Sequence, residues 1–281
     1  MEMKKTFISL FALLLAQTTF AAPAGITVIP NEILQGDPIL ITATGSSSLT
    51  KTILDGKSYP VFMYAGKSQS LIGIDLAKKA GIYELRAIFK TGEIATTTIT
   101  IALRPEPPVE SVPIPEKLGG NTSSSQSKLV ASISSESADL KKVITGKTSL
   151  WTKKFTPPLA VVKITNPYGY GVDTGQYVIA HKGTDLKASI GTKVFAMNKG
   201  VVKLTRTYKA YGKTILIDHG LGLQTLYLHL SKINVKEGSI VARGQVIGLS
   251  GDTGYITGPH LHLSIRLNGV SIDPMKFMGL F

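Results

Sequence analysis

The sequence predicts an all-β protein with two β-rich parts, joined by a linker that carries one short helix. Short runs of β-branched and alternating residues, separated by Gly and Asp turns, fill both ends of the chain. A Pro- and Ser-rich stretch with helical spacing of apolar residues lies between them. We therefore divide the 281 residues into a signal segment (1–21), a β-sandwich domain (22–104), a linker (105–150) and a C-terminal domain (151–281).

The N-terminal domain is expected to be a small immunoglobulin-like β-sandwich. Gly-containing turns separate its short strands, as in sandwiches of this kind. It contains no histidine and its acidic residues are scattered, so we expect no catalytic chemistry from it. The expected strands are 26–29, 39–42, 83–89 and 95–102.

The linker should begin as a stiff, extended connector, because five prolines lie between residues 104 and 115. Residues 119–127 are rich in Gly, Ser and Asn and are expected to be flexible. Apolar residues at helical spacing then predict a helix over 127–144, with Ser137 as a cap of its second half.

The N-terminus resembles a secretory signal. Lys4 and Lys5 precede an apolar run over 7–16, and small residues at Thr19 and Ala21 allow cleavage after Ala21. The run is shorter than the roughly 20 residues of a membrane span, and an uncleaved anchor is the alternative. No later segment is long enough to cross, so we expect no stable membrane insertion and a periplasmic or secreted protein. The absence of cysteine excludes disulfides and an N-terminal lipidated Cys.

The chain is strongly basic, with a net charge of +13 and a pI of about 9.7. Such a charge favours polyanionic surroundings: nucleic acid, anionic lipid or an anionic cell wall. There is no zinc finger, no RNP-like run and no stripe of basic and aromatic residues, so we expect no nucleic acid partner.

The C-terminal domain is expected to be an antiparallel sheet or barrel-like structure with little helix. Glycines lie between its short strands or at their ends. The expected strands are 192–196, 200–206, 213–218, 224–229, 240–242, 246–248 and 260–267.

Four of the five histidines fall into three short patterns in this domain: His181-Lys-Gly-Thr-Asp185, Tyr227-Leu-His229-Leu230 and His260-Leu-His262. Successive side chains of a strand alternate faces, so the last two histidines should point the same way. Two His and one Asp can hold a zinc ion and leave a position open for water, with two further His for proton transfer. A lone strand His is usually structural, and we assign His219 that role. The joint occurrence of the other four favours a metal site.

Residues 155–274 resemble the lysostaphin/LytM-type zinc metallopeptidases of bacterial cell walls. The resemblance rests on motifs spread along the domain: Thr165-Asn-Pro-Tyr-Gly-Tyr170, His181-Lys-Gly-Thr-Asp-Leu186, Gly191-Thr-Lys-Val-Phe-Ala196, Asp218-His-Gly-Leu-Gly222, Thr225-Leu-Tyr-Leu-His-Leu230 and Gly254-Tyr-Ile-Thr-Gly-Pro-His-Leu-His262. One departure is Gly171, where Arg is common in the family.

The resemblance implies zinc (Zn2+) as cofactor and His181, Asp185 and His262 as its ligands. It implies His229 and His260 as the catalytic pair, without settling which of them is the general base. The implied activity is a zinc metalloendopeptidase, a peptidoglycan hydrolase, that cuts the peptide cross-links of peptidoglycan. The alternatives are a glycyl-glycine endopeptidase and a non-catalytic wall-binding or hydrolase-activating module, which missing ligands would favour; none is missing.

The expected substrate groove lies between the loops 168–177 and 251–258, where Tyr177 or Tyr255 is a candidate donor to the oxyanion. A wall hydrolase needs restraint. We therefore expect self-inhibition, in which the N-terminal domain, the linker or Asn166 covers the zinc.

Overall fold

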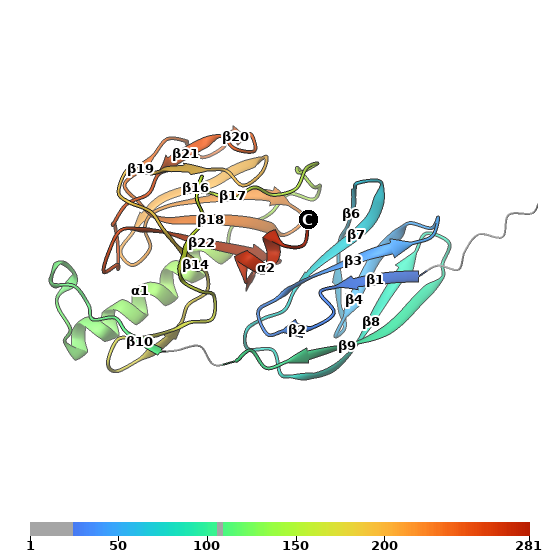
Figure 1. The fold of residues 1–281 in the computed structure, drawn as a ribbon, viewed down its shortest axis with the longest axis horizontal. Helices are drawn as coiled ribbons and strands as arrows, with labels where there is room; N and C mark the ends of the chain where they lie inside the picture. The colour runs from blue at the N-terminus through green and yellow to red at the C-terminus, as the bar shows by residue number, and fades with distance from the viewer. Residues whose placement is uncertain (1–24, 106–108) are drawn as a thin grey trace, which may run out of the picture.

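The computed structural model describes residues 25–105 and 109–281, which form a nearly all-β molecule with two α-helices (Figure 1). The all-β prediction is therefore confirmed. The expected signal segment 1–21 lies outside the described residues. Within the described ranges, no helix has the length and apolar character to cross a membrane.

The N-terminal residues form two sheets that share one apolar core. The sheets have the strand orders β1-β3-β7-β6 and β2-β9-β8-β4-β5. Ile39 and Ile72 from the first sheet meet Leu85 and Ile101 from the second in this core. The immunoglobulin-like assignment stays a prediction. The strands are β1 (Gly25–Ile29), β2 (Ile33–Leu34), β3 (Pro38–Thr44), β4 (Leu49–Leu54), β5 (Lys57–Tyr59), β6 (Val61–Tyr64), β7 (Lys67–Gly73), β8 (Gly81–Phe89) and β9 (Ile94–Ala102).

The linker is more ordered than expected. It contains β10 (Val109–Ser111), a 3-10 turn (Glu116–Leu118) and the helix α1 (Ser123–Lys141). The helix was predicted, but its expected bounds and cap were wrong. The side chain of Thr122 accepts a hydrogen bond from the Ser125 N–H at 3.2 Å and starts the helix, whereas Ser137 lies inside it. The N-cap accounts for the early start, since a capping hydroxyl satisfies a free N–H of the first turn.

The C-terminal residues form an eight-stranded sheet with the order β11-β14-β22-β18-β17-β16-β20 and β23 on β22. Its register pairs are antiparallel, because hairpins connect many of its neighbours. The expected strands 200–206, 213–218, 224–229, 240–242 and 260–267 lie in this sheet, which also contains three strands that were not predicted: β11, β14 and β23. The bounds are β11 (Ile164–Asn166), β14 (Thr184–Lys187), β16 (Gly200–Tyr208), β17 (Gly212–Gly220), β18 (Leu223–Leu230), β20 (Ile240–Val241), β22 (His260–Leu267) and β23 (Val270–Ile272).

Two smaller sheets and a helix complete this part of the molecule. One sheet has the order β15-β21-β19, and the other joins the linker strand β10 to the hairpin β12-β13. Helix α2 begins after Asp273, whose side chain accepts hydrogen bonds from the N–H groups of Met275 and Lys276. The remaining bounds are β12 (Gly171–Asp173), β13 (Val178–Ala180), β15 (Lys193–Phe195), β19 (Lys232–Ile233), β21 (Val246–Leu249) and α2 (Pro274–Met278).

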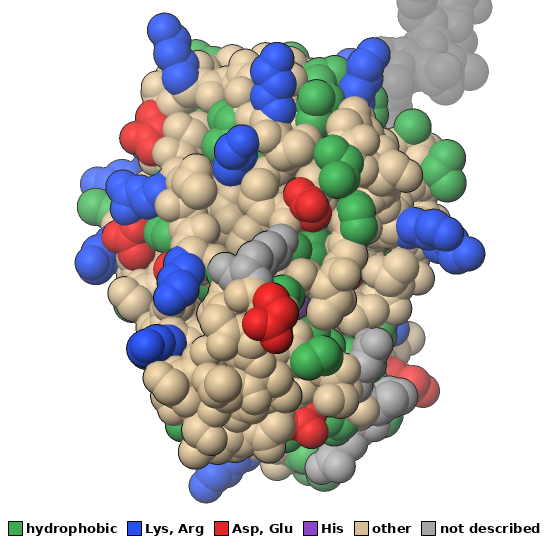
Figure 2. Space-filling model, turned by 90° about the vertical axis from the view of Figure 1, so that its left-hand side faces the viewer, with side chains coloured by type: hydrophobic (Ala, Val, Ile, Leu, Met, Phe, Trp, Pro, Cys, Tyr) green, Lys and Arg blue, Asp and Glu red, His purple; other side chains and the backbone are tan. Residues whose placement is uncertain are grey.

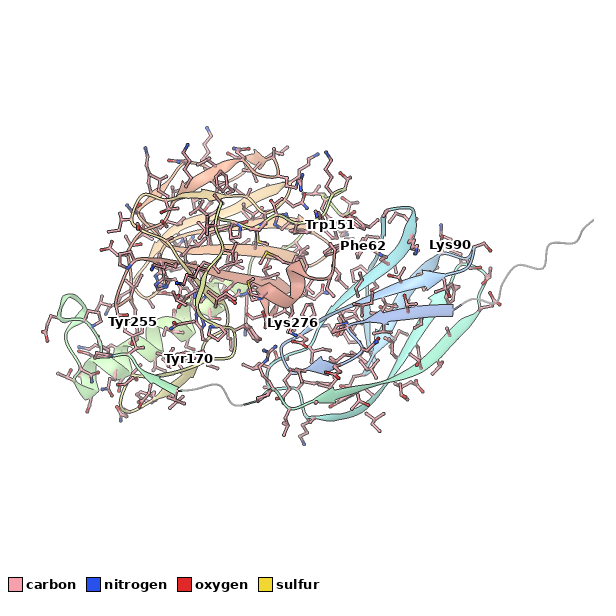
Figure 3. All side chains as sticks on the ribbon, viewed as in Figure 1. Phe62, Lys90, Trp151, Tyr170, Tyr255 and Lys276 are labelled. Carbon is pink, nitrogen blue, oxygen red and sulfur yellow. The ribbon has the colours of Figure 1, made fainter. Side chains whose placement is uncertain are left out.

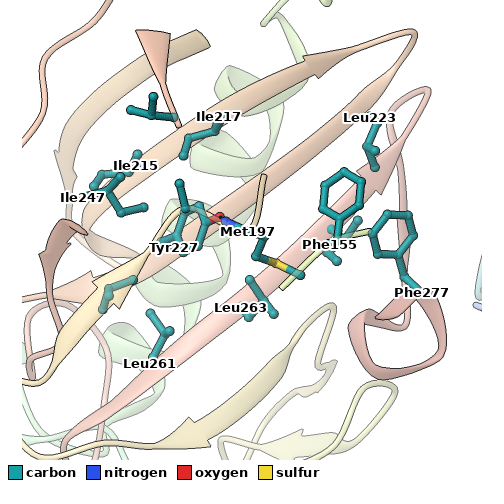
Figure 4. Packing of buried hydrophobic residues seen from close by; sticks show 14 of the residues in the cluster. Phe155, Met197, Ile215, Ile217, Leu223, Tyr227, Ile247, Leu261, Leu263 and Phe277 are labelled. Atoms are coloured by element: carbon teal, nitrogen blue, oxygen red, sulfur yellow. Dashed lines mark hydrogen bonds between the residues drawn. The ribbon is translucent and has the colours of Figure 1, made fainter. Parts of the chain in front are cut away.

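The two faces of the large sheet pack against different parts of the molecule. Leu261 and Leu263 of β22 are 0% exposed and pack into the core with Tyr227 and Phe277 (Figure 4). The alternating residues of β22 therefore point to the opposite face. On that face Leu140 of α1 packs against leucines of β16, β17 and β18. The alternation predicted for β22 thus places Leu261 and Leu263 in the core and His260 and His262 on the opposite face.

Aromatic and ionic contacts join the N-terminal sheets to the C-terminal part. Phe62 and Trp151 stack edge to face at 5.1 Å between ring centroids, at the junction labelled in Figure 3. Arg104 forms ion pairs with Asp37 at 2.6 Å and with Asp273 at 3.3 Å. The side chain of Arg104 is only 14% exposed, so these pairs are shielded from solvent.

Candidate functional site

Two neighbouring strands bring the candidate metal ligands together. Asp185 on β14 lies directly opposite His262 on β22 in the antiparallel register, so both side chains leave the same face. His181 lies just before β14. The backbone N–H of His181 donates to the Tyr170 carbonyl at 2.7 Å, and its carbonyl accepts from the Gly169 N–H at 2.8 Å. These two bonds fix the loop beside the sheet.

The three side chains converge on one point. Asp185 Oδ1 lies 3.1 Å from His181 Nε2 and 2.9 Å from His262 Nδ1, and the two nitrogens are 2.9 Å apart. Donor atoms with bonds of about 2.0 Å to a tetrahedral zinc ion are separated by about 3.3 Å. The spacing of the cluster is close to that value, so the three atoms could share one small ion.

The outer hydrogen bonds of both imidazoles fix where their protons lie. His181 Nδ1 faces the Pro167 carbonyl at 3.1 Å, which can only accept, so Nδ1 carries the proton and Nε2 a lone pair. Ser264 Oγ donates to the Lys182 carbonyl at 2.9 Å and so accepts from His262 Nε2, also at 2.9 Å. His262 Nδ1 is then unprotonated.

With both imidazoles neutral, the cluster therefore presents lone pairs toward one point. Burial raises the pKa of Asp185, but the charges and hydrogen bonds of His181 and His262 outweigh it and hold that pKa well below its usual range. Asp185 is thus a carboxylate at neutral pH. Two lone-pair nitrogens 2.9 Å apart beside an anion need a cation among them, either a metal ion or a proton. Burial opposes a proton on His181, but the charge and hydrogen bond of Asp185 outweigh it and raise the pKa of His181. Two imidazoles and a carboxylate suit zinc, so these residues fit the metal.

His229 and His260 lie beside this cluster. Their ring centroids are 5.1 Å apart, and His229 lies 5.9 Å from the His262 ring. His260 Nδ1 faces the Gly258 carbonyl at 3.0 Å, and its Nε2 lies 3.5 Å from Asp185 Oδ1. The structure therefore brings all five predicted site residues into one group.

His229 is held in an unusual backbone conformation. Its φ is +61°, in the left-handed region that non-glycine residues rarely adopt. Its N–H donates to the Tyr211 carbonyl at 3.1 Å, and its Nδ1–H donates to the Thr253 carbonyl at 2.8 Å. Burial, followed by the charges of His260 and His262, lowers the pKa of His229 to about 3. The ring is therefore neutral at pH 7, with its free lone pair on Nε2.

The site is recessed. The side chains of His181, Asp185, His260 and His262 are 10%, 11%, 18% and 12% exposed. On the face drawn in Figure 2, histidine surface is visible only as a small area between hydrophobic and acidic side chains, and Lys and Arg side chains lie farther out. A ligand of this group must therefore enter a hollow rather than bind to an open surface.

Sequence reasoning missed three supporting residues: Ser264, Thr253 and Gly183. Ser264 follows His262 by two residues in a strand, and this spacing could have identified it. Gly183 has no room for a side chain, because a Cβ there would lie 2.3 Å from His262 Nε2. No sequence signal places Thr253 against His229, since their contact depends on two loops meeting.

The tyrosines and His219 lie in other surroundings. Tyr255 Oη donates to the Val112 carbonyl at 2.6 Å, and Tyr177 Oη lies 3.3 Å from Ser127 Oγ, so both engage the linker. His219 is buried, and its nitrogens bond the Lys199 carbonyl and the Thr225 hydroxyl. This arrangement agrees with a structural role for His219.

The comparisons with known proteins identify the class of this domain. Residues 179–274 match peptidase family M23. The C-terminal domain is therefore an M23 metallopeptidase domain, of a zinc-dependent family.

Particular relatives share this region. The chain is 50% identical over 99 residues to the peptidoglycan DD-endopeptidase ShyA of Vibrio cholerae, covering 35% of this chain and 23% of that protein. It is 40% identical over 120 residues to the DD-carboxypeptidase/endopeptidase Mpg of Neisseria meningitidis, covering 42% and 28%. The chain thus spans about a quarter of the length of these relatives.

A solved structure from Pseudomonas aeruginosa, described under peptidase M23, extends the likeness beyond the family region. It is similar to this chain with a TM-score of 0.66 at 25% identity, over 89% of this chain and 97% of that one. The N-terminal sheets are therefore part of a shared architecture.

Proposed function

We propose that this protein is a periplasmic or secreted zinc endopeptidase that hydrolyses the peptide cross-links of bacterial peptidoglycan. The convergence of His181, Asp185 and His262 donor atoms beside two further histidines carries the proposal. The similar proteins named DD-endopeptidases support the choice of substrate. The basic charge also suits an anionic cell wall.

Each histidine has a distinct role in this proposal. His181, Asp185 and His262 hold the zinc, which when bound polarises a carbonyl and lowers the pKa of water to about 7. His260 Nε2 lies 3.5 Å from Asp185 Oδ1, and the His229 ring lies 5.9 Å from the His262 ring. Of His229 and His260, one accepts the proton of the attacking water on its Nε2 lone pair and passes it to the leaving amine. The other, as an imidazolium with a proton on Nε2, stabilises the oxyanion by hydrogen bonding. The Thr253 carbonyl keeps His229 in the tautomer that leaves Nε2 free.

The test uses mature protein from Ala22 onward and a His262→Ala control. Zinc content is measured by mass spectrometry, and the products of digested peptidoglycan are analysed as muropeptides. One zinc per chain and loss of cross-linked dimers, both absent in the control, are expected. Products cut in glycine bridges would replace the proposed bond. Absence of both zinc and cleavage would refute the enzyme and leave a wall-binding module.

The proposal includes a domain organisation and a restraint on the site. Residues 22–104 serve as an accessory domain, 105–150 as a linker and 151–281 as the peptidase domain. The linker joins both expected walls of the groove. Strand β10 pairs with β12 in one wall, and the Val112 N–H donates to the Asp173 carbonyl there at 2.8 Å. The Val112 carbonyl accepts the hydroxyl of Tyr255 in the other wall. These contacts support the proposal that residues 109–112 cover the groove and limit access.

The departure from the family pattern at Gly171 supports this restraint. A Cβ at this position would lie 3.0 Å from Val109 Cγ2. Strand β10 can therefore dock in its present position only if residue 171 is a glycine; with any other residue, Val109 would have to shift slightly. The family's common arginine would exclude this docking. The glycine at position 171 therefore explains why β10 can pair with β12 in this protein.

Two variants test the restraint. Gly171→Arg should displace β10, and Val112→Pro should remove the N–H that bonds Asp173. Both should raise the rate of cross-link cleavage at unchanged zinc content, whereas Ser111→Ala, with an exposed side chain on the same strand, should not. Unchanged or lower rates in both variants would contradict self-inhibition by the linker.

A further inference from the structure

A buried carboxylate on α1 is anchored to a turn of the peptidase domain. Glu136 is 8% exposed, and its carboxylate accepts hydrogen bonds from three consecutive backbone N–H groups. The N···O distances are 2.9 Å from Lys209, 2.9 Å and 3.2 Å from Ala210, and 3.0 Å from Tyr211. These three residues form the turn between β16 and β17. Charge-assisted bonds of this kind are short and directional, so they fix the turn in one orientation.

The carbonyl groups of the same turn hold the candidate site. The Ala210 carbonyl accepts the N–H of Tyr255 at 2.7 Å, and the Tyr211 carbonyl accepts the N–H of His229 at 3.1 Å. The peptide group between Ala210 and Tyr211 is therefore bound at both ends, by Glu136 on one side and by the groove loop on the other. Through this turn, α1 reaches both His229 and one wall of the groove.

His229 depends on such support. Its left-handed φ of +61° is strained for a residue with a Cβ, and surrounding structure must maintain it. The loop that carries Thr253 also packs on this turn, because a Cβ at Gly254 would lie 2.4 Å from the Ala210 carbonyl oxygen. It packs equally closely on the next residue, Gly212, where a Cβ would lie 2.3 Å from the Thr253 carbonyl oxygen. That carbonyl is the one that orients the His229 ring. Movement of the turn would therefore shift both the backbone and the ring of His229.

A buried carboxylate is a poor choice for stability alone. Removing a charge from water is unfavourable, and a well-packed apolar residue at such a position often gives equal or greater stability. What the carboxylate offers instead is orientation, since it binds three N–H groups at once. Directional control of the turn thus accounts for Glu136 better than helix docking does.

We infer that Glu136 is a positioning residue for the peptidase reaction, acting through the 209–211 turn on His229 and on the loop of Thr253 and Tyr255. This inference rests on the proposed endopeptidase function. Within the part of the chain that the structure describes, the Glu136 carboxylate bonds the 209–211 backbone and not the histidine cluster, so it acts only through the backbone. It places a catalytic requirement in the linker helix, outside the region matched to the peptidase family.

The first experiment compares Glu136→Ala, Glu136→Gln and Leu140→Ala with the unchanged protein. Leu140 is 1% exposed on the same helix. It packs in an apolar cluster with leucines of the sheet and with the side chain of Tyr211, but it accepts no hydrogen bond from the turn's N–H groups, so its variant measures the effect of weakened helix docking. We expect Glu136→Ala to lower kcat about tenfold, equivalent to 1.4 kcal/mol at the transition state, with KM changed less than twofold and zinc content intact. Glu136→Gln, which keeps one acceptor oxygen, should recover part of the loss. An equal loss of kcat in Leu140→Ala, or a higher kcat in Glu136→Ala, would overturn the inference.

A second measurement needs no substrate and separates this inference from the proposed function. Amide hydrogen exchange is followed for peptides that contain His229 and Tyr255. Faster exchange at these amides in Glu136→Ala, but not in Leu140→Ala, is expected because their acceptors belong to the freed turn. Unchanged exchange in Glu136→Ala would refute the positioning role. If the unchanged protein cleaves no cross-links while the exchange differs as expected, the proposed function fails and the structural coupling stands.

Discussion

The left-handed backbone of His229 predicts that glycine is better tolerated at this position than alanine. His229→Ala and His229→Gly both remove the imidazole and its bond to the Thr253 carbonyl. The two variants differ in how easily residue 229 adopts its backbone conformation, which has a φ of +61°. An L-residue in this region costs about 1–2 kcal/mol, whereas glycine adopts it freely.

The expected difference can be worked from these terms. The higher conformational entropy of unfolded glycine offsets about 0.5–1 kcal/mol of the gain. We expect a net advantage of about 0.5–1 kcal/mol for His229→Gly, equivalent to about 1–2 °C in Tm for a chain of 281 residues. Neither variant should cleave substrate, so stability and activity separate at this residue.

The assay is urea unfolding of the zinc-free variants, followed by the fluorescence of Trp151. This residue is the only tryptophan of the chain and is 2% exposed, so its emission should report loss of the core. Lys203 is exposed on β16 and does not have a positive φ. In the control variants at this position, Lys203→Ala should therefore be more stable than Lys203→Gly. If His229→Ala equals or exceeds His229→Gly in stability, the strain at His229 is not real.

Three further predictions follow from single contacts. Ser264→Ala removes the acceptor of His262 Nε2–H, and a competition titration should show zinc affinity about 10–100-fold lower; unchanged affinity would contradict the tautomer assignment. Burial lowers the pKa of His219 from 6.5 to about 4, so its contribution is complete above pH 6.5 and is lost as the pH falls through 4. Relative to His219→Gln, the free energy of unfolding should therefore decline by roughly 3 kcal/mol over that window, and parallel slopes for both proteins would refute it. Arg266 is 5% exposed, and its Nε and Nη1 have no hydrogen-bond partner among the described residues. Arg266→Met should therefore keep or raise Tm in a thermal melt, and a clear fall in Tm would indicate a partner for the guanidinium.

Local patterns predicted which side chains lie together in the candidate site. The period of two in β22 places His260 and His262 on one face and Leu261 and Leu263 in the core, as the burial of the leucines shows. Strand ranges followed from the same alternation and from glycine turns. The helix bounds failed because the Thr122 cap and the contacts of α1 decide where it begins, and apolar spacing does not record them.

Only the tertiary structure decided the chemistry within the site. The sequence by itself determined which residue types were available and which of them shared a strand face. The tautomers of His181 and His262 depend on Pro167, Ser264 and Lys182, which lie in separate segments. The support of His229 by the 209–211 turn, and of that turn by Glu136, joins residues up to 75 positions apart. Such contacts form only when distant elements pack against one another, and the local pattern of residues along the chain does not determine that packing.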